Sequence, residues 1–357
     1  MTLRRPRRVR VRRLVLNVRL KRDRRGPGGP FRHFPGCYMK LFDRRYARPL
    51  SHFAPLPVRR GWKAVTAFFG RDDFSYVGLA PGDPARVAAE VPLPDPDPTP
   101  RPVNPDAEVR VCLHLHYPDL WPEFETVLKA WMPKQHDREP PSWGLIVTLT
   151  PGAASVLGDI GKAFPGARAL VTENRGRDIG PFFELMHSGA LDGAKAICKL
   201  HGKRSVSDKR PQLLGELWRR SATRSLLGQS AAIIDAMTRD APLCVAAGPT
   251  HLLAPSARIS EKSAWAGRRA HIEQWSETIG LPNPRIRFFA GSMFWLASPC
   301  IDQLKKLNLS LKDFEPETDL TIHSTTYTGE RIFLIAAERS GGPIALLSPN
   351  GRIASFE

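Results

Sequence analysis

Residues 172–183, with the sequence TENRGRDIGPFF, decide the fold prediction together with a second segment, residues 197–205 (ICKLHGKRS). The first segment follows an apolar, strand-like run, residues 169–171, and the second begins within such a run, residues 196–198. After its apolar run, each segment is rich in charged residues and glycine. In an α/β sheet, ligands bind at the carboxyl ends of the strands, where such loops gather. Two neighbouring loops of this kind therefore predict a binding site for a phosphorylated ligand.

These two loops supply the charged groups expected at that site. Arginine can bind phosphate oxygens through two hydrogen bonds at once, and lysine acts as a point charge. Asp178 has two interpretations: it lines the pocket and caps the following helix, or it forms a structural Asp–Arg pair within its own loop. The expected cations are Arg175, Arg177, Lys199, His201, Lys203 and Arg204.

Strand-like runs alternate with helical patterns through the middle of the chain. The predicted strands are residues 109–115, 144–149, 167–171, 194–200 and 243–247. This alternation predicts an α/β, Rossmann-like domain with a mainly parallel sheet and helices on both faces. Near the end of the chain, Asn350 and Gly351 separate two short apolar runs, which predicts a β-hairpin.

Composition divides the chain into four predicted parts. Residues 1–35 form a basic, disordered tail, residues 36–90 a small helical or irregular pre-domain, residues 91–107 a proline-rich linker, and residues 108–357 the α/β domain. Residues 1–25 hold 12 of the 53 basic residues and one of the 35 acidic ones, within a net charge of +18. A solvated tail, an anionic membrane surface and a nucleic acid all fit this charge, and nucleic acid fits least because the main domain has no nucleic-acid-binding motif.

The cysteine content and the hydropathy of the sequence indicate the cellular compartment in which the protein is expected. The five cysteines contain no CxxC pair, which argues against a zinc site or a disulfide framework and favours a reducing compartment. The N-terminus lacks the continuous apolar core of a signal peptide, and no run approaches the ~18 apolar residues of a membrane span. We therefore expect a cytoplasmic protein, attached peripherally to the inner membrane through residues 1–25.

Several well-known ligand motifs are missing from the sequence. No GxGxxG follows the first predicted strand, and the chain contains no Walker loop and no HExxH, which disfavours a dehydrogenase, a P-loop enzyme and a zinc peptidase. His114 and His116 lie two residues apart and would point the same way on a strand. A metal pair would need further ligands, so a structural or substrate-contacting role is favoured, with Tyr117 beside them.

Two later segments are also candidates. Residues 288–295 (FFAGSMFW) are apolar, and Gly291 and Ser292 within them would let the backbone approach a ligand closely. The alternative is a buried strand with a bulge. The acidic stretch after residue 314 offers Glu317 and Asp319, with His323 nearby, as general-base candidates, against the alternative of a solvated acidic loop.

Three of these motifs together resemble the rhamnan synthesis protein F family: residues 173–182 (ENRGRDIGPF), 198–205 (CKLHGKRS) and 290–295 (AGSMFW). The segment 111–120 is similar too, and the resemblance extends over about residues 109–340. It implies glycosyl transfer, typically of rhamnose, in the building of cell-surface polysaccharide. Glu330 and Arg331 match a Glu-Arg pair of the family, whereas residues 322–325 (IHST) replace an acidic stretch. A non-catalytic glycan-binding or assembly module is the alternative function.

The resemblance and the loops together imply a GT-A-like domain. Many GT-A transferases hold a metal ion against the donor diphosphate with an Asp-x-Asp motif after a central strand, where this chain has His201, Gly202 and Lys203. Cations can neutralise a departing diphosphate directly, so we expect a metal-independent site without a cofactor. The expected partners are a nucleotide-sugar donor and a glycan or lipid-linked glycan acceptor. Asn174, Gly176, Gly291 and Ser292 complete the predicted donor site, and the predicted acceptor or pocket lining is His114, His116, Tyr117 and Trp295.

Overall fold

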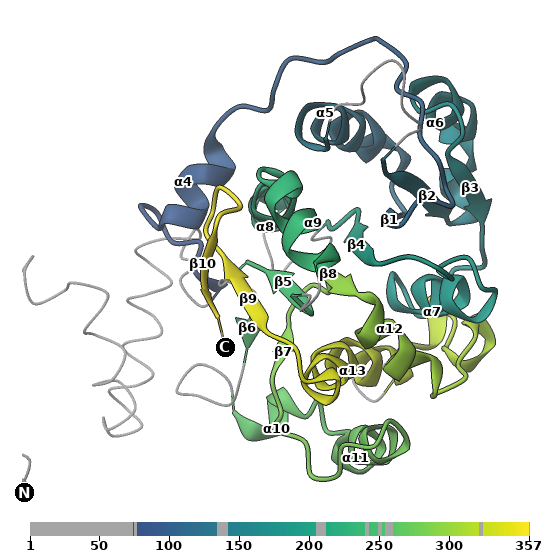
Figure 1. Cartoon of the computed structure of the whole chain (residues 1–357), viewed down its shortest axis with the longest axis vertical. Coiled ribbons are helices and arrows are strands. Elements are labelled where there is room, and N and C mark those ends of the chain that lie inside the picture. The colour runs from purple at the N-terminus through teal and green to yellow at the C-terminus, as the bar shows by residue number, and fades with distance from the viewer. Residues whose placement is uncertain are drawn as a thin grey trace, which may run out of the picture. The chain divides into compact units, whose positions relative to one another are not determined.

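An eight-stranded sheet forms the centre of the computed structural model, in the strand order β10-β9-β5-β8-β4-β1-β2-β3 (Figure 1). The structure describes residues 74, 77–133, 142–204, 212–239, 243–248, 252–253, 260–320 and 324–356. The predicted basic tail and most of the predicted pre-domain lie outside these residues. The strands of the sheet are β1 (Val109–Leu115), β2 (Gly144–Leu149), β3 (Arg168–Val171), β4 (Ala196–His201), β5 (Val245–Ala247), β8 (Phe294–Ala297), β9 (Ile344–Leu347) and β10 (Ile353–Phe356).

Most neighbouring strands of the sheet run in the same direction. Strands β3, β2, β1 and β4 pair in parallel, and so do β5 and β9. Strand β8 pairs antiparallel with both β4 and β5, and β10 pairs antiparallel with β9. The predicted α/β, Rossmann-like class with a mainly parallel sheet is confirmed. The predicted hairpin around Asn350 is confirmed as the β9–β10 pair, and a separate short pair joins β6 (Leu252–Leu253) to β7 (Phe288–Phe289).

Helices cover both faces of the sheet because the parallel strands are apolar on both sides. In β1, Val111 and Leu113 face one core, and Cys112 faces the other. The first core contains α4 (Pro84–Glu90), α5 (Trp121–Trp131), α6 (Leu157–Ala163), α8 (Gln212–Leu227) and α9 (Ser230–Thr238). The second contains α7 (Ile179–His187), α10 (Glu261–Ala264), α11 (Arg269–Thr278), α12 (Ser298–Lys305) and α13 (Thr325–Ser340).

The order of the strands creates a topological switch point between β1 and β4. The chain passes from β1 to β2 and β3 on one side, and then returns to place β4 on the other side of β1. At such a point the connections leave in opposite directions and open a crevice at the carboxyl ends of the strands, where open α/β sheets bind their ligands.

The proline-rich segment 91–107 contains no helix or strand and runs along the α/β domain. The Arg101 guanidinium donates to the carbonyls of Lys129 (2.6 Å) and Met132 (3.0 Å) at the carboxyl end of α5. Val103 is buried and its N–H donates to the Pro165 carbonyl (2.9 Å). Helix α4 precedes this segment and packs into the first core. Of the helices that the structure describes, none is sufficiently long and apolar to cross a membrane.

Candidate functional site

Two histidines lie side by side at the switch point. His114 on β1 and His201 on β4 are register partners, so their side chains are on the same face of the sheet. Thr148 is the register partner of His114 on β2, and its hydroxyl shares a hydrogen bond of 3.0 Å with His114 Nδ1. His114 is buried and His201 is nearly so, so both imidazoles belong to a polar row across the carboxyl end of the sheet.

A buried ion pair lies next to this row. Lys199 precedes His201 by two residues and therefore points to the same face of β4. Its side chain is 2% exposed, and its ammonium group pairs with the carboxylate of Asp178, just before α7. The same group donates to the Ser292 carbonyl (3.0 Å), and the Ser292 hydroxyl donates to Asp178. Three aromatic rings lie within 6 Å of Lys199 Nζ: Phe182, Phe294 and Phe333.

This pairing decides the role of Asp178. Burial by itself would raise the pKa of the Asp178 carboxyl, but the charges of His201 and Lys199 and two hydrogen bonds outweigh burial and hold that pKa well below its usual range. Asp178 occupies the N-cap position of α7, yet its side chain makes no capping hydrogen bond. Asp178 thus stands at the predicted cap position but does not cap the helix through its side chain, and the partner of its carboxylate is a lysine on β4 rather than an arginine of its own loop.

The hydrogen bonds of His201 define its tautomer. Nε2 lies 2.8 Å from the Gly291 carbonyl oxygen, which can only accept, so Nε2 carries the proton. Nδ1 therefore holds the lone pair, and it faces Asp178 Oδ1 at 3.9 Å. Burial, together with the charges of Lys199 and Lys203, lowers the pKa of His201 to about 4, although Asp178 opposes the shift. His201 is thus neutral at pH 7, contrary to our expectation of a cation.

Burial lowers the pKa of His114 further, to about 3. The two imidazoles at the switch point are therefore both uncharged at neutral pH, and Lys199 supplies the positive charge that Asp178 pairs with. The ion pair has no net charge, so this part of the site offers hydrogen-bonding groups rather than an excess of cations.

Gly291 and Ser292 form a dipeptide, here called the clasp, in which every polar group is engaged. The Gly291 N–H donates to Glu330 Oε1 (2.9 Å) on α13, and its carbonyl accepts from His201. The Ser292 N–H donates to a backbone carbonyl, its own carbonyl accepts from Lys199, and its hydroxyl donates to Asp178. Both residues have left-handed backbone angles, with φ of +84° and +45°. Strained backbone of this kind concentrates at functional sites.

The first predicted loop has a second left-handed pair, Gly176 (φ +64°) and Arg177 (φ +54°). Gly176 lies so close to Phe314 that an added Cβ would be 2.7 Å from the Phe314 Cβ, which explains the glycine. Arg175 donates to the Phe314 carbonyl (2.9 Å) and so attaches the loop to the segment that follows α12. Arg177 is half exposed and pairs with Glu317 at 3.4 Å.

The loop after β4 places its cations against aromatic rings. Lys203 Nζ lies 4.5 Å from the centre of the Trp218 ring on α8. The Arg204 guanidinium lies 4.7 Å from the centre of the Tyr117 ring and pairs with Asp119. His116 is exposed and contacts Tyr117 edge to face, with ring centres 4.7 Å apart. Predicted acceptor and donor residues thus meet on this side of the switch point.

Arg219, which sequence reasoning missed, holds that loop in place. It is buried on α8 and donates twice to the Glu123 carboxylate, at 2.9 and 2.6 Å. Its remaining nitrogen donates to the Lys203 carbonyl at 2.7 Å. Thr148 was missed as well, because only strand register brings it to His114. Glu330 was noticed as part of a motif, and its contact with the clasp gives that motif a structural role.

Three of the predicted residues that the structure describes lie apart from the cluster. Trp295 is fully buried, because on β8 it points to the first core, and its Nε1 donates to the Leu226 carbonyl (2.8 Å). Glu317 reaches the first loop but is exposed. Asp319 is exposed and accepts from its neighbour Thr318. His323 lies outside the described residues.

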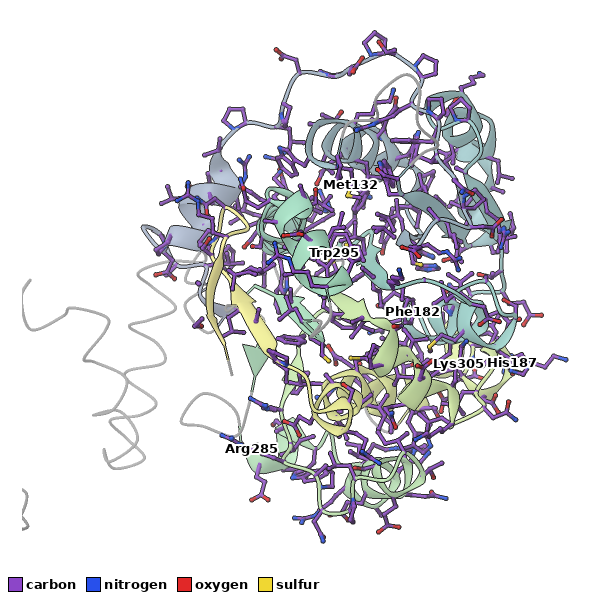
Figure 2. All side chains as sticks on the ribbon, in the orientation of Figure 1. Met132, Phe182, His187, Arg285, Trp295 and Lys305 are labelled. Carbon is purple, nitrogen blue, oxygen red and sulfur yellow. The ribbon has the colours of Figure 1, made fainter. Side chains whose placement is uncertain are left out.

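A described cavity lies elsewhere in the molecule. It has a volume of about 310 Å³ at the carboxyl end of α7, the end opposite Asp178, and it contains none of the predicted site residues. Two of its lining residues, His187 and Lys305, are labelled in Figure 2, as is the buried Trp295. We take the switch-point cluster as the candidate site because chemistry and topology coincide there. Among the described residues, no group of three or more His, Cys, Asp or Glu side chains is arranged to hold a metal ion.

Comparison with known proteins identifies the family of the chain. Two proteins of Xanthomonas campestris pv. campestris, both named uncharacterized protein WxcX and one of them from strain B100, are each 29% identical to this chain over 171 residues. The alignment covers 47% of this chain and 24% of each relative, so the chain matches about a quarter of their length. No solved structure matches. Residues 96–341, which include both charged loops, the clasp and Glu330, match rhamnan synthesis protein F. The chain therefore belongs to the rhamnan synthesis protein F family.

Proposed function

We propose that this chain is a glycosyltransferase of the rhamnosyltransferase type, which moves a sugar from a nucleotide-sugar donor to a growing cell-surface polysaccharide. The observation that carries the proposal is the polar cluster around His114, His201 and Asp178 at the β1–β4 switch point. Open α/β sheets bind nucleotides at this position, and the family works in polysaccharide synthesis.

The cations around the cluster suggest how the donor is bound. Lys199 is buried in its pair with Asp178, whereas Lys203, Arg204 and Arg177 are more accessible, so the donor diphosphate would contact these three cations. Fixed positive groups that meet the charge of a departing diphosphate stabilise the transition state without a metal ion. Asn174 and Gly176 would line the same side of the donor pocket, and the loop that carries His116 and Tyr117 would receive the glycan or lipid-linked glycan acceptor.

A thermal-shift screen of the purified chain against a panel of nucleotide sugars tests this proposal, followed by a transfer assay with and without a chelator. A nucleotide sugar should raise the melting temperature, and transfer should continue in the chelator. If a glycan raises the melting temperature while no nucleotide sugar does, the chain is a glycan-binding or assembly module instead. Transfer that stops in the chelator would show that the site needs a metal ion.

A further inference from the structure

Two hydrogen-bond acceptors face each other at the switch point. Nε2 of His201 donates to the Gly291 carbonyl, so in the neutral ring Nδ1 holds the lone pair, and Asp178 Oδ1 lies 3.9 Å from it. The other carboxylate oxygen, Oδ2, receives both Lys199 and Ser292. Within the part of the chain that the structure describes, neither Nδ1 nor Oδ1 receives a hydrogen bond. An imidazole lone pair and a carboxylate cannot hydrogen-bond each other, so the site suits a donor group, such as a hydroxyl that donates to Nδ1.

We infer that the attacking hydroxyl of the acceptor sugar donates to His201 Nδ1, with Asp178 Oδ1 beside it, and that His201 is the general base. This inference rests on the proposed function. In the reaction, the acceptor oxygen forms a bond to the anomeric carbon of the donor sugar as its proton passes to His201 Nδ1. The bond from the anomeric carbon to the diphosphate oxygen breaks, and the nucleoside diphosphate leaves with the electron pair.

The surroundings of His201 suit a base that must start unprotonated. Burial and the Lys199 and Lys203 ammonium groups disfavour a proton on the resting imidazole, and Asp178 favours it. When the hydroxyl proton arrives, Asp178 Oδ1 is in place to stabilise the imidazolium, as a carboxylate does beside a catalytic histidine. A departing diphosphate also brings negative charge, which favours the imidazolium further.

The ring is held in the orientation that this role requires. The Gly291 carbonyl fixes one edge of the imidazole, and the clasp is itself held by Glu330, Lys199 and Asp178. A general base works when its geometry is fixed within hydrogen-bonding reach of the proton that it removes. Glu317, which the sequence offered as a general-base candidate, is exposed and paired with Arg177, so its carboxylate is not held in a fixed orientation in this way.

The variant His201→Gln separates the base from the scaffold. The glutamine amide can still donate to the Gly291 carbonyl, but it offers no basic nitrogen. We expect sugar transfer to fall on the order of 10²- to 10⁴-fold, the usual contribution of a general base, with the melting temperature close to that of the wild type. His187→Gln is the matched control, because His187 is exposed at the far end of α7. Transfer by His201→Gln at the wild-type rate would overturn the inference.

A second measurement does not depend on transfer activity. In ¹⁵N-histidine-labelled full-length protein, the His201 signals, assigned through His201→Gln, should report a neutral ring with the proton on Nε2 at pH 7. Addition of methyl rhamnoside should shift Nδ1. If no nucleotide sugar supports transfer but Nδ1 still responds to methyl rhamnoside, the proposed transferase function fails and the hydroxyl site stands. A proton on Nδ1 in the resting protein, or no response to methyl rhamnoside, would overturn the hydroxyl site itself.

Discussion

Lys199 and Asp178 form a buried ion pair that joins β4 to the start of α7, next to the two histidines of the switch point. The Ser292 carbonyl and hydroxyl complete the coordination of both groups. The pair therefore connects three segments that are distant in sequence, and it determines which charges in the site remain available to a ligand.

Breaking this pair from one side should destabilise the protein strongly. Lys199→Met leaves the Asp178 carboxylate buried without its counter-ion, and Asp178→Asn leaves the Lys199 ammonium group buried without its counter-ion. Each substitution should lower the free energy of unfolding by about 3–5 kcal/mol. The double variant should lose much less than the sum of the two single variants, because neither charge is then unpaired. Urea unfolding of the wild type and three variants measures the coupling. Additive losses would contradict a direct ion pair.

The two neutral histidines should make stability depend on pH. The pKa values of His201 (about 4) and His114 (about 3) lie below the ordinary histidine value of 6.5. At a pH between the ordinary value and these lowered values, the unfolded chain therefore binds more protons than the folded chain. The free energy of unfolding should therefore fall as pH is lowered from about 6.5 to 4, by up to about 1.4 kcal/mol per pH unit for each histidine.

Denaturant unfolding at a series of pH values measures that slope. His201→Gln should reduce it, since glutamine does not titrate. Asp178 acts in the same direction at lower pH: its lowered pKa adds stability that is present above about pH 4 and is lost as pH falls below that value. An identical slope in His201→Gln and the wild type would show that His201 titrates normally.

The clasp should not tolerate a side chain at its glycine. Gly291→Ala forces a Cβ onto a residue with φ of +84° and brings it 3.1 Å from Trp218 Nε1. We expect a loss of about 1 kcal/mol or more in the free energy of unfolding. Gly158→Ala is the control, because this helical glycine has an ordinary φ and open space around it, so alanine should stabilise α6 by about 0.5–1 kcal/mol. Equal effects at the two positions would argue against strain in the clasp.

Lys203 should matter for transfer and little for folding. Removing one cation that stabilises leaving-group charge costs on the order of 3 kcal/mol in the transition state, so Lys203→Ala should lower transfer roughly a hundredfold. Lys195→Ala is the matched control, because Lys195 immediately precedes the amino end of β4, opposite the end that carries the Lys203 loop, and is paired with Glu108. Initial rates of both variants are compared with the wild type. Similar rates for all three proteins would remove Lys203 from the donor site.

The basic N-terminal segment should bind anionic membranes. Residues 1–25 carry a charge of about +11, and each Lys or Arg near an anionic surface adds about 1 kcal/mol. Sedimentation with phosphatidylglycerol-containing liposomes should therefore show binding that weakens steeply with salt and is lost when residues 1–25 are deleted. If the deleted chain binds as well as the full chain, the segment does not attach the protein to membranes.

The alternation of apolar runs with helical patterns was sufficient for the class of fold. Strands buried on both faces must be apolar along most of their length, so β1, β2 and β4 are visible in the sequence as mainly apolar runs. The same reasoning located the charged loops, because polar residues that follow a buried strand must lie at its carboxyl end. The antiparallel direction of β8 could not be predicted, because a short apolar run of four residues does not indicate which way its strand runs in the sheet.

The sequence by itself determined the α/β class, the carboxyl-end position of the charged loops and, through its motifs, the family. Only the tertiary structure decided which of those charges remain available. Lys199 and Asp178 are 21 residues apart, and Ser292 is 114 residues from Asp178. Whether a lysine is neutralised or a histidine loses its proton depends on burial and on charges within a few ångströms, and local residue patterns do not encode such distances. Register between β1 and β4, and the turn that folds the clasp back onto them, created the site from residues that the sequence keeps apart.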